Sequence, residues 1–270
     1  MSSSFFKKAL IGGAVAAGAA VWAIAPRTFS DKRRNYVPAI PDVWYAHRGL
    51  HDAGSGLTAQ YAAESGEYVA LARRMAMKAG YGNPSVLGAI APENSLAAFA
   101  AACEAGYGIE LDLQMTADGE VVVVHDDDLM RVAGDPRDVE LMEKGDALLQ
   151  AYSGAYVVES FNPAAVNWYK ENRPEVCRGQ LSWWPEGKDA PTDPVALAKE
   201  YAAGALVFDW ISRPDFVAYD WKGGNSPQVR LARFMGAVPV SWTVRSRDEL
   251  AQCDDWFDHH IFEAFVPDER

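Results

Sequence analysis

The sequence predicts an α/β protein built from βα units around a parallel sheet, with an apolar helix at its N-terminus. Of the 270 residues, 49% are hydrophobic and 23% are charged, so the bulk of the chain is globular and not disordered. Beyond the N-terminal segment, short apolar runs typical of strands alternate with helical patterns. Seven strands are predicted, which is one fewer than an eight-stranded parallel barrel requires.

The N-terminal segment predicts a membrane anchor. Basic residues flank an apolar run at positions 9–25, whose seventeen residues are at the lower limit for crossing a bilayer core of about 30 Å. A cleaved signal peptide is the alternative, since Ala23-Ile24-Ala25 resembles an A-x-A cleavage site. Pro26 directly after this site makes cleavage awkward, so we expect an uncleaved single-pass helix. Basic residues on both sides leave its orientation open.

We expect residues 1–36 to form this anchor and a basic linker, and residues 37–270 to form one domain. Residues 51–91 have the character of a loop insertion, which leaves roughly 190 residues for the core. The formal net charge of −12 argues against a nucleic-acid partner, because phosphate binding needs clustered Lys and Arg. Three scattered cysteines indicate neither a disulfide framework nor a zinc site, and buried thiols are expected.

The polarity pattern places the elements along the chain. Asn94 is expected to cap a helix through residue 105, and residues 109–115 alternate strictly, as a half-buried strand does. Asp118-Gly119 predicts a tight turn, after which residues 120–125 return as a second strand. Further strands are predicted at 43–46, 155–160, 177–182, 216–220 and 239–244, and helices at 137–152, 163–172, 194–211, 228–235 and 247–253.

Two acidic side chains share one face of the predicted strand 109–115. Glu110 and Asp112 are two residues apart and therefore point the same way, while the apolar residues between them point toward the core. Carboxylates that converge in this way offer oxygen ligands suited to Mg²⁺ or Ca²⁺. An exposed edge strand shows the same alternation, so the pair alone leaves both interpretations open.

Two histidines end predicted strands and have charged neighbours. His47 precedes Arg48 after one strand, and His125 closes another. The carboxyl ends of parallel strands share one rim of a barrel, so both imidazoles are expected to face the same pocket as the carboxylates. Imidazoles titrate near neutrality and suit general acid and general base work. The remaining histidines lack such neighbours and are expected in a loop (His51) or on the surface (His259 and His260).

Four ordered motifs, with a fifth near the end, carry a resemblance to a known family. They are Ala46-His47-Arg48-Gly49, Ala91-Pro92-Glu93-Asn94-Ser95, Glu110-Leu111-Asp112, His125-Asp126 and Ser241-Trp242-Thr243-Val244. In sequence and spacing they resemble the glycerophosphodiester phosphodiesterases. The resemblance covers most of the chain from residue 45 to residue 267, apart from the insertion.

This resemblance implies a TIM-type barrel of the phospholipase-C-like phosphodiesterase kind, with a divalent metal, Mg²⁺ or Ca²⁺. It implies hydrolysis of a small glycerophosphodiester to glycerol phosphate and an alcohol. By position, His47 and His125 would be the acid–base pair, Arg48 would hold phosphate, and Glu110 with Asp112 would bind metal. Trp242 would line the glycerol pocket, and a buried barrel aromatic is the alternative for this residue.

The chain departs from the family's pattern in two places. The insertion replaces a short loop, and its helix-like stretch 57–78 predicts either a lid over the site or a helix packed on the side of the barrel. After His125 the family has a strand with a Glu and a Lys that contact metal and phosphate, and this sequence has none. We therefore expect a barrel lacking one βα unit, and a catalytically impaired membrane-anchored scaffold or binding protein is the alternative function.

Overall fold

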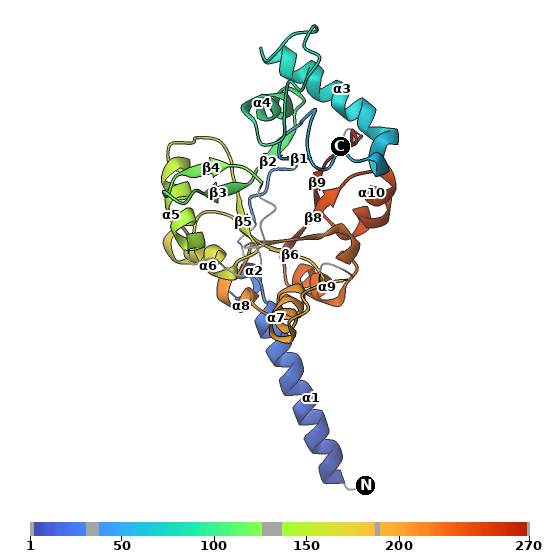
Figure 1. The fold of residues 1–270 in the computed structure, drawn as a ribbon. Coiled ribbons are helices and arrows are strands. Elements are labelled where there is room, and N and C mark those ends of the chain that lie inside the picture. Colours follow the sequence, from blue (N-terminus) through green and yellow to red (C-terminus); the bar gives the residue numbers. More distant parts are fainter. Residues whose placement is uncertain (1–2, 31–37, 126–136, 187–189, 269–270) are drawn as a thin grey trace. The chain divides into compact units, whose positions relative to one another are not determined.

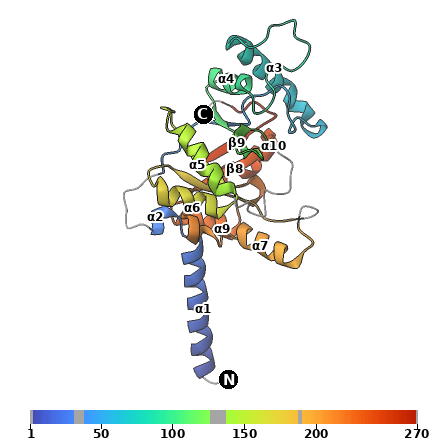
Figure 2. The same cartoon turned by 60° about the vertical axis from the view of Figure 1, so that its left-hand side comes forward.

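A computed structural model describes residues 3–30, 38–125, 137–186 and 190–268 (Figures 1 and 2). The chain divides into two compact units. One consists of residues 1–39, 156–218 and 225–238, and the other of residues 40–155, 219–224 and 239–270. The segment between the predicted strand 120–125 and helix 137–152 lies largely outside the described residues, so the missing βα unit stays a prediction.

The first unit alternates helices with parallel strands. Its strands β5 and β6 pair in parallel, with Val158 opposite Arg178. Asn162 and Asp193 accept hydrogen bonds from the first turns of α6 and α7, and proline follows each cap, which is a favoured way to start a helix. Its elements are α1 (Ser3–Ile24), α2 (Arg27–Ser30), β5 (Val158–Ser160), α6 (Pro163–Asn172), β6 (Arg178–Ser182), α7 (Pro194–Gly204), α8 (Asp209–Ser212), most of β7 (Phe216–Asp220) and α9 (Pro227–Phe234).

The second unit holds the other part of the parallel structure and an antiparallel hairpin. Its parallel strands lie in the order β2, β1, β9, β8. The hairpin of β3 and β4 packs against α5 (Figure 1). Its elements are β1 (Tyr45–His47), η1 (Ala59–Tyr61), α3 (Ala62–Lys78), α4 (Leu96–Glu104), β2 (Gly108–Glu110), β3 (Leu113–Met115), β4 (Val121–Val123), α5 (Arg137–Leu149), η4 (Trp221–Gly223), β8 (Val238–Val244), α10 (Arg247–Cys253), η5 (Asp254–Trp256) and β9 (His259–Phe262).

The predicted strand 109–115 is in fact two strands in different sheets. Glu110 ends β2, which pairs with β1, while Leu113 begins β3, which pairs with β4. Leu111 is exposed and Asp112 lies between the strands, so the strict alternation in polarity does not arise from one half-buried strand. The turn at Asp118-Gly119 and the return strand are confirmed, with Gly119 in the left-handed region at φ 86°.

The expectation of a surface position for His259 and His260 is wrong. Both lie in β9, and both are buried. The ring of His260 is satisfied on its two sides, by the Ser241 hydroxyl at 2.7 Å from Nδ1 and by the Asp254 carboxylate at 3.0 Å from Nε2. Polar partners make the imidazole of His260 tolerable in a core strand, and the sequence gives no sign of those partners.

The expected membrane anchor is also wrong. Residues 3–24 form α1, but among the helices of the described residues none is long and apolar enough to cross a membrane. Ala and Gly make up much of this run, and such small side chains contribute little apolar surface. The last turn of α1 packs within the first unit instead, where Trp22 stacks on Trp210 and Arg213 donates to the carbonyls of Trp22 and Ala25.

A buried carboxyl group in the first unit yields a prediction about pH. Asp209 is 1% exposed, and its Oδ2 has no hydrogen-bond partner among the described residues. Burial raises its pKa well above the ordinary value, and the charge of Arg213 offsets only part of this. A raised folded-state pKa stabilises the fold below the unfolded-state value, and this contribution is lost as pH rises through the folded-state value.

We therefore expect Asp209→Asn to raise the free energy of unfolding at pH 8, by about 1.4 kcal/mol for each unit by which folding raises the pKa. Urea unfolding at pH 5 and pH 8 measures the difference, with the exposed Asp268→Asn as control. Equal effects of Asp209→Asn at the two pH values would contradict the raised pKa.

Candidate active site

The carboxyl ends of the parallel strands in the second unit gather charged side chains. His47 ends β1, Glu110 ends β2, Glu263 directly follows β9, and Arg245 directly follows β8. The parallel register places His47 opposite Glu110. Because parallel strands end at the same edge of a sheet, side chains far apart in the sequence meet there.

Glu263 is the most completely enclosed acid of this site. Its carboxylate is fully buried and accepts three hydrogen bonds. One oxygen lies 3.1 Å from His47 Nδ1 and 2.9 Å from Arg245 Nε, and the other lies 3.0 Å from His51 Nε2. Burial alone would raise the pKa of Glu263, but the hydrogen bonds from both imidazoles and the charge of Arg245 hold it well below its usual range.

The surroundings of His47 favour the neutral form of its imidazole. Burial lowers its pKa, and the hydrogen bond and charge of Glu263 only partly counter that effect. The charges of Arg48 and Arg245 lower the pKa further. An imidazole that stays neutral near pH 7 keeps one nitrogen able to accept a proton, as a general base requires.

Arg48, the residue after His47, contacts three acidic side chains. Its backbone N–H donates to Glu110 Oε2 at 3.1 Å, its Nη1 lies 3.1 Å from Glu93 Oε2, and its Nε lies 3.3 Å from Asp112 Oδ2. Arg48 has a left-handed backbone with φ 58°, an uncommon conformation for a residue other than glycine. Such conformations cost free energy and often occur at functional sites.

Glu110 and Asp112 both contact Arg48 even though they do not share a strand. Both reach the same residue, Arg48, and their side chains are 19% and 25% exposed. Asp112 is further fixed by the amide of Asn94, whose Nδ2 donates to its Oδ2 at 3.0 Å. Two carboxylates at the edge of a partly open site offer the oxygen donors that a hard cation takes.

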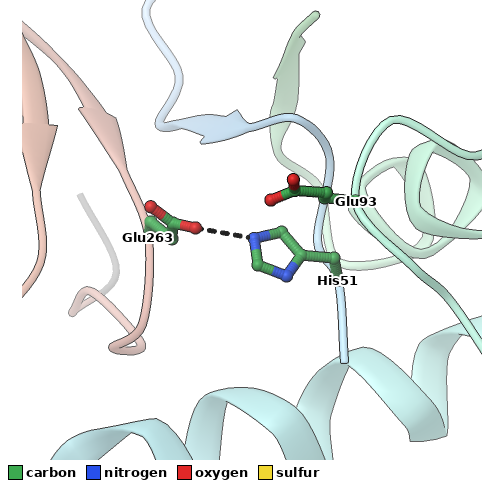
Figure 3. Close-up of side chains that lie close together, drawn as sticks. All are labelled: His51, Glu93 and Glu263. Atoms are coloured by element: carbon green, nitrogen blue, oxygen red, sulfur yellow. Dashed lines mark hydrogen bonds and ion pairs between the residues drawn. The ribbon is translucent and has the colours of Figure 1, made fainter. Parts of the chain in front are cut away.

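The insertion begins inside this site. His51 lies in a loop, as expected, and its imidazole is fully buried and bonded to Glu263. Figure 3 shows His51, Glu93 and Glu263 directed toward one another from three different segments. One ligand atom of each lies within 4.8 Å of the others, so a metal ion is chemically conceivable here too.

The backbone of the insertion passes directly over these carboxylates. The N–H of Ser55 donates to Glu93 Oε2 at 2.9 Å, and a Cβ on Gly56 would lie about 2.0 Å from the carboxylate of Glu263. Farther along, α3 packs on α4 (Figures 1 and 2). Tyr68 of α3 is buried and meets the ring of His51 edge-on. The start of the insertion thus encloses the site, and its helix packs on a neighbouring helix.

The remaining predicted site residues lie elsewhere in the second unit. His125 follows β4 of the antiparallel hairpin, not a strand of the parallel sheet, and is partly exposed. Trp242 is in β8 and lines a cavity of about 690 Å³ together with Tyr61, Lys222 and Arg245. Arg245, which bonds Glu263, thus also lines the cavity that contains Trp242.

The sequence interpretation missed Glu263, His51 and Arg245 as site residues. Glu263 follows β9, a strand that the sequence pattern does not predict. The apolar pair Ile261-Phe262 directly before Glu263 was the available signal for a buried strand ending in a functional acid. Glu93 belongs to the motif at residues 91–95 that carries the family resemblance, but the sequence pattern indicates no role for it.

Comparison with known proteins finds sequence similarity over part of the chain. Residues 86–155 match the model of the Glycerophosphoryl diester phosphodiesterase family. A stretch of 41 residues is 56% identical to a glycerophosphodiester phosphodiesterase of Caldanaerobacter subterraneus subsp. tengcongensis and to the uncharacterized protein YqiK of Bacillus subtilis. That stretch is 15% of this chain and 17% of the length of each of these two proteins.

Solved structures extend the similarity to most of the chain. A glycerophosphodiester phosphodiesterase of Parabacteroides distasonis superposes with a TM-score of 0.50 at 15% identity, over 82% of this chain and 92% of that one. A protein of Silicibacter pomeroyi, provisionally named a glycerophosphoryl diester phosphodiesterase, gives 0.52 at 17% identity, over 84% and 92%. The fold is therefore the α/β TIM-type fold of these proteins, and a segment of the chain carries the family's sequence pattern.

The close approach of the insertion to Glu263 gives a prediction. Gly56→Ala should destabilise the protein by about 1–3 kcal/mol, because the added methyl group collides with a buried carboxylate that three donors hold in place. Gly88→Ala, in the same insertion but with open space around it, is the matched control and should change stability little. Chemical denaturation measures both, and equal stability of the two variants would show that the loop does not enclose Glu263.

Proposed function

We propose that this protein hydrolyses glycerophosphodiesters to glycerol phosphate and an alcohol, with a divalent cation and two histidines for proton transfer. The observation that carries the proposal is that Glu110 and Asp112 both contact Arg48, the residue after His47, and that Glu110 lies 4.0 Å from His47. These residues belong to the motifs that resemble the phosphodiesterases, and the family model and the fold point to the same class.

The charges around Arg48 and Glu263 support a divalent cation. Two guanidinium groups, Arg48 and Arg245, face four carboxylates, namely Glu93, Glu110, Asp112 and Glu263. With neutral imidazoles this group has a formal surplus of two negative charges, which one divalent cation would balance. Mg²⁺ and Ca²⁺ both prefer oxygen ligands of this kind.

Glu110 and Asp112 are the residues proposed to hold the cation. The cluster of His51, Glu93 and Glu263 is less suitable, because three donors already bond Glu263 and its hydrogen bond uses His51 Nε2. When bound, such an ion acts as a Lewis acid that polarises phosphoryl oxygens.

The protein's own side chains would bind the diester and move protons. Arg48 would hold the phosphate, and Arg245 is a second guanidinium within the cavity that Trp242 lines. Trp242 would offer an apolar wall to the glycerol part. One histidine would deprotonate the nucleophile, water or a substrate hydroxyl, and the other would protonate the oxygen of the leaving alcohol.

Removal of the cation tests the proposal. Hydrolysis of glycerophosphocholine should stop in EDTA and return on addition of Mg²⁺ or Ca²⁺. Glu110→Gln should bind the cation more weakly in calorimetry and need a higher concentration for half-maximal rate, because it loses one charged ligand. Glu104→Gln, which removes only an ion pair with Lys78 away from the site, should behave as the unaltered protein does. Full activity in EDTA would exclude the proposed cation chemistry.

The proposed role of His125 gives a further prediction. If it protonates the leaving alcohol, His125→Ala should slow the hydrolysis of glycerophosphocholine by about 10²–10⁴-fold. A diester with p-nitrophenol as leaving group needs little protonation, so its hydrolysis should slow much less. Equal losses for the two substrates would contradict a role as general acid.

A further inference from the structure

The hydrogen bond between His47 and Glu263 determines which nitrogen of His47 carries its proton. An ionised carboxylate only accepts hydrogen bonds, so the imidazole nitrogen facing it must be a donor. Glu263 lies 3.1 Å from Nδ1. In the neutral ring, the proton is then on Nδ1, and Nε2 has the free lone pair.

The other nitrogen of His47 faces the residues proposed to act on the diester. His47 Nε2 lies 4.0 Å from Glu110 Oε2, and the side chain of His47 is 12% exposed. The ring thus has a buried face toward Glu263 and a second face toward Glu110. A substrate hydroxyl or water near Glu110 would meet the unprotonated nitrogen.

Glu263 is itself held so that it cannot turn away from His47. The oxygen that faces Nδ1 also accepts from Arg245 Nε at 2.9 Å, and the opposite oxygen accepts from His51 Nε2 at 3.0 Å (Figure 3). The carboxylate is fully buried, and Gly56 approaches so closely that a methyl group would not fit. His51 is therefore a support for Glu263.

We propose that Glu263 is a positioning residue that keeps His47 in the tautomer with the proton on Nδ1, so that Nε2 accepts the proton of the nucleophile. The assignment rests on the proposed diesterase function. In the step, the nucleophile's O–H bond breaks, its proton goes to Nε2, and its oxygen forms a new bond to phosphorus. The bond from phosphorus to the leaving alcohol breaks, and the departing oxygen takes a proton from His125.

Glu263 would also stabilise the imidazolium that this step forms. His47 then has protons on both nitrogens and a positive charge, beside a carboxylate at hydrogen-bond distance. A carboxylate that orients a catalytic histidine and stabilises its imidazolium is an established arrangement in serine proteases, where its replacement by an amide lowers kcat by about 10⁴-fold.

The tautomer can be measured without any activity. Long-range ¹H–¹⁵N correlation spectra distinguish the protonated from the unprotonated nitrogen of a neutral imidazole, and the His47→Asn spectrum identifies the signals of His47. In the unaltered protein we expect the proton on Nδ1. Glu263→Gln should shift His47 toward the other tautomer, because an amide can donate to Nδ1 as well as accept from it.

The matched control is a second carboxylate that bonds a histidine. That histidine is His260, in the strand β9 that Glu263 follows. Asp254 bonds His260 Nε2 at 3.0 Å and does not contact His47. Asp254→Asn should leave the His47 signals and the rate of hydrolysis unchanged. Glu263→Gln should lower kcat by about 10²–10⁴-fold with a much smaller effect on KM, and Glu263→Asp, which keeps the charge, should restore part of the loss.

The outcomes separate the two proposals. A proton on Nε2 of His47 in the unaltered protein overturns the positioning role, and this measurement does not depend on whether Glu263→Gln folds. An unchanged His47 signal in a folded Glu263→Gln variant also overturns it. A proton on Nδ1 in a protein that hydrolyses no glycerophosphodiester supports the geometric assignment and overturns the diesterase function on which its catalytic meaning rests.

Discussion

A carboxylate buried without access to water needs hydrogen-bond donors around it, and Glu263 is such a carboxylate. Its three partners come from the end of β1, the start of the insertion and the segment after β8. Loss of one partner of a buried charge typically costs about 3–5 kcal/mol, because the remaining charge stays desolvated. The positions of His47, His51 and Arg245 are therefore coupled through this single acid.

Arg48 has the complementary role for the acids that stay partly exposed. Its backbone and guanidinium reach Glu110, Glu93 and Asp112, which come from three segments. Left-handed backbone conformations recur beside these side chains, at Arg48, at Asn94 (φ 56°) and at Ala264 (φ 64°). Strain of this kind persists only where surrounding contacts determine the conformation, and the buried ion pairs supply such contacts.

The insertion is a part of the site and not only an addition to the fold. Its first residues supply His51, the Ser55 donors to Glu93 and the glycine backbone next to Glu263. Its helix α3 then packs on α4, and Tyr61 just before it bonds Glu249 and lines the cavity with Trp242. One inserted segment therefore packs against the buried Glu263 and borders the cavity proposed for substrate.

The sequence by itself determined the local elements and the chemical character of several residues. Alternating polarity, turn residues and helix caps depend on near neighbours, so the hairpin at Asp118-Gly119 and helix α10 follow from the sequence pattern. The motifs around His47 and Glu110 also stand out locally, because each is a short run of unusual residues at a strand end.

Only the tertiary structure decided which of these side chains meet. Glu263 and His51 are 212 positions apart, and nothing in the sequence near either one indicates that the two side chains meet. The polarity pattern of residues 109–115 could not reveal that Glu110 and Leu113 belong to different sheets, since one strand and two short strands give the same alternation. A charged or imidazole group can be buried only where side chains from distant segments form hydrogen bonds or ion pairs with it. These contacts exist only once the chain has folded.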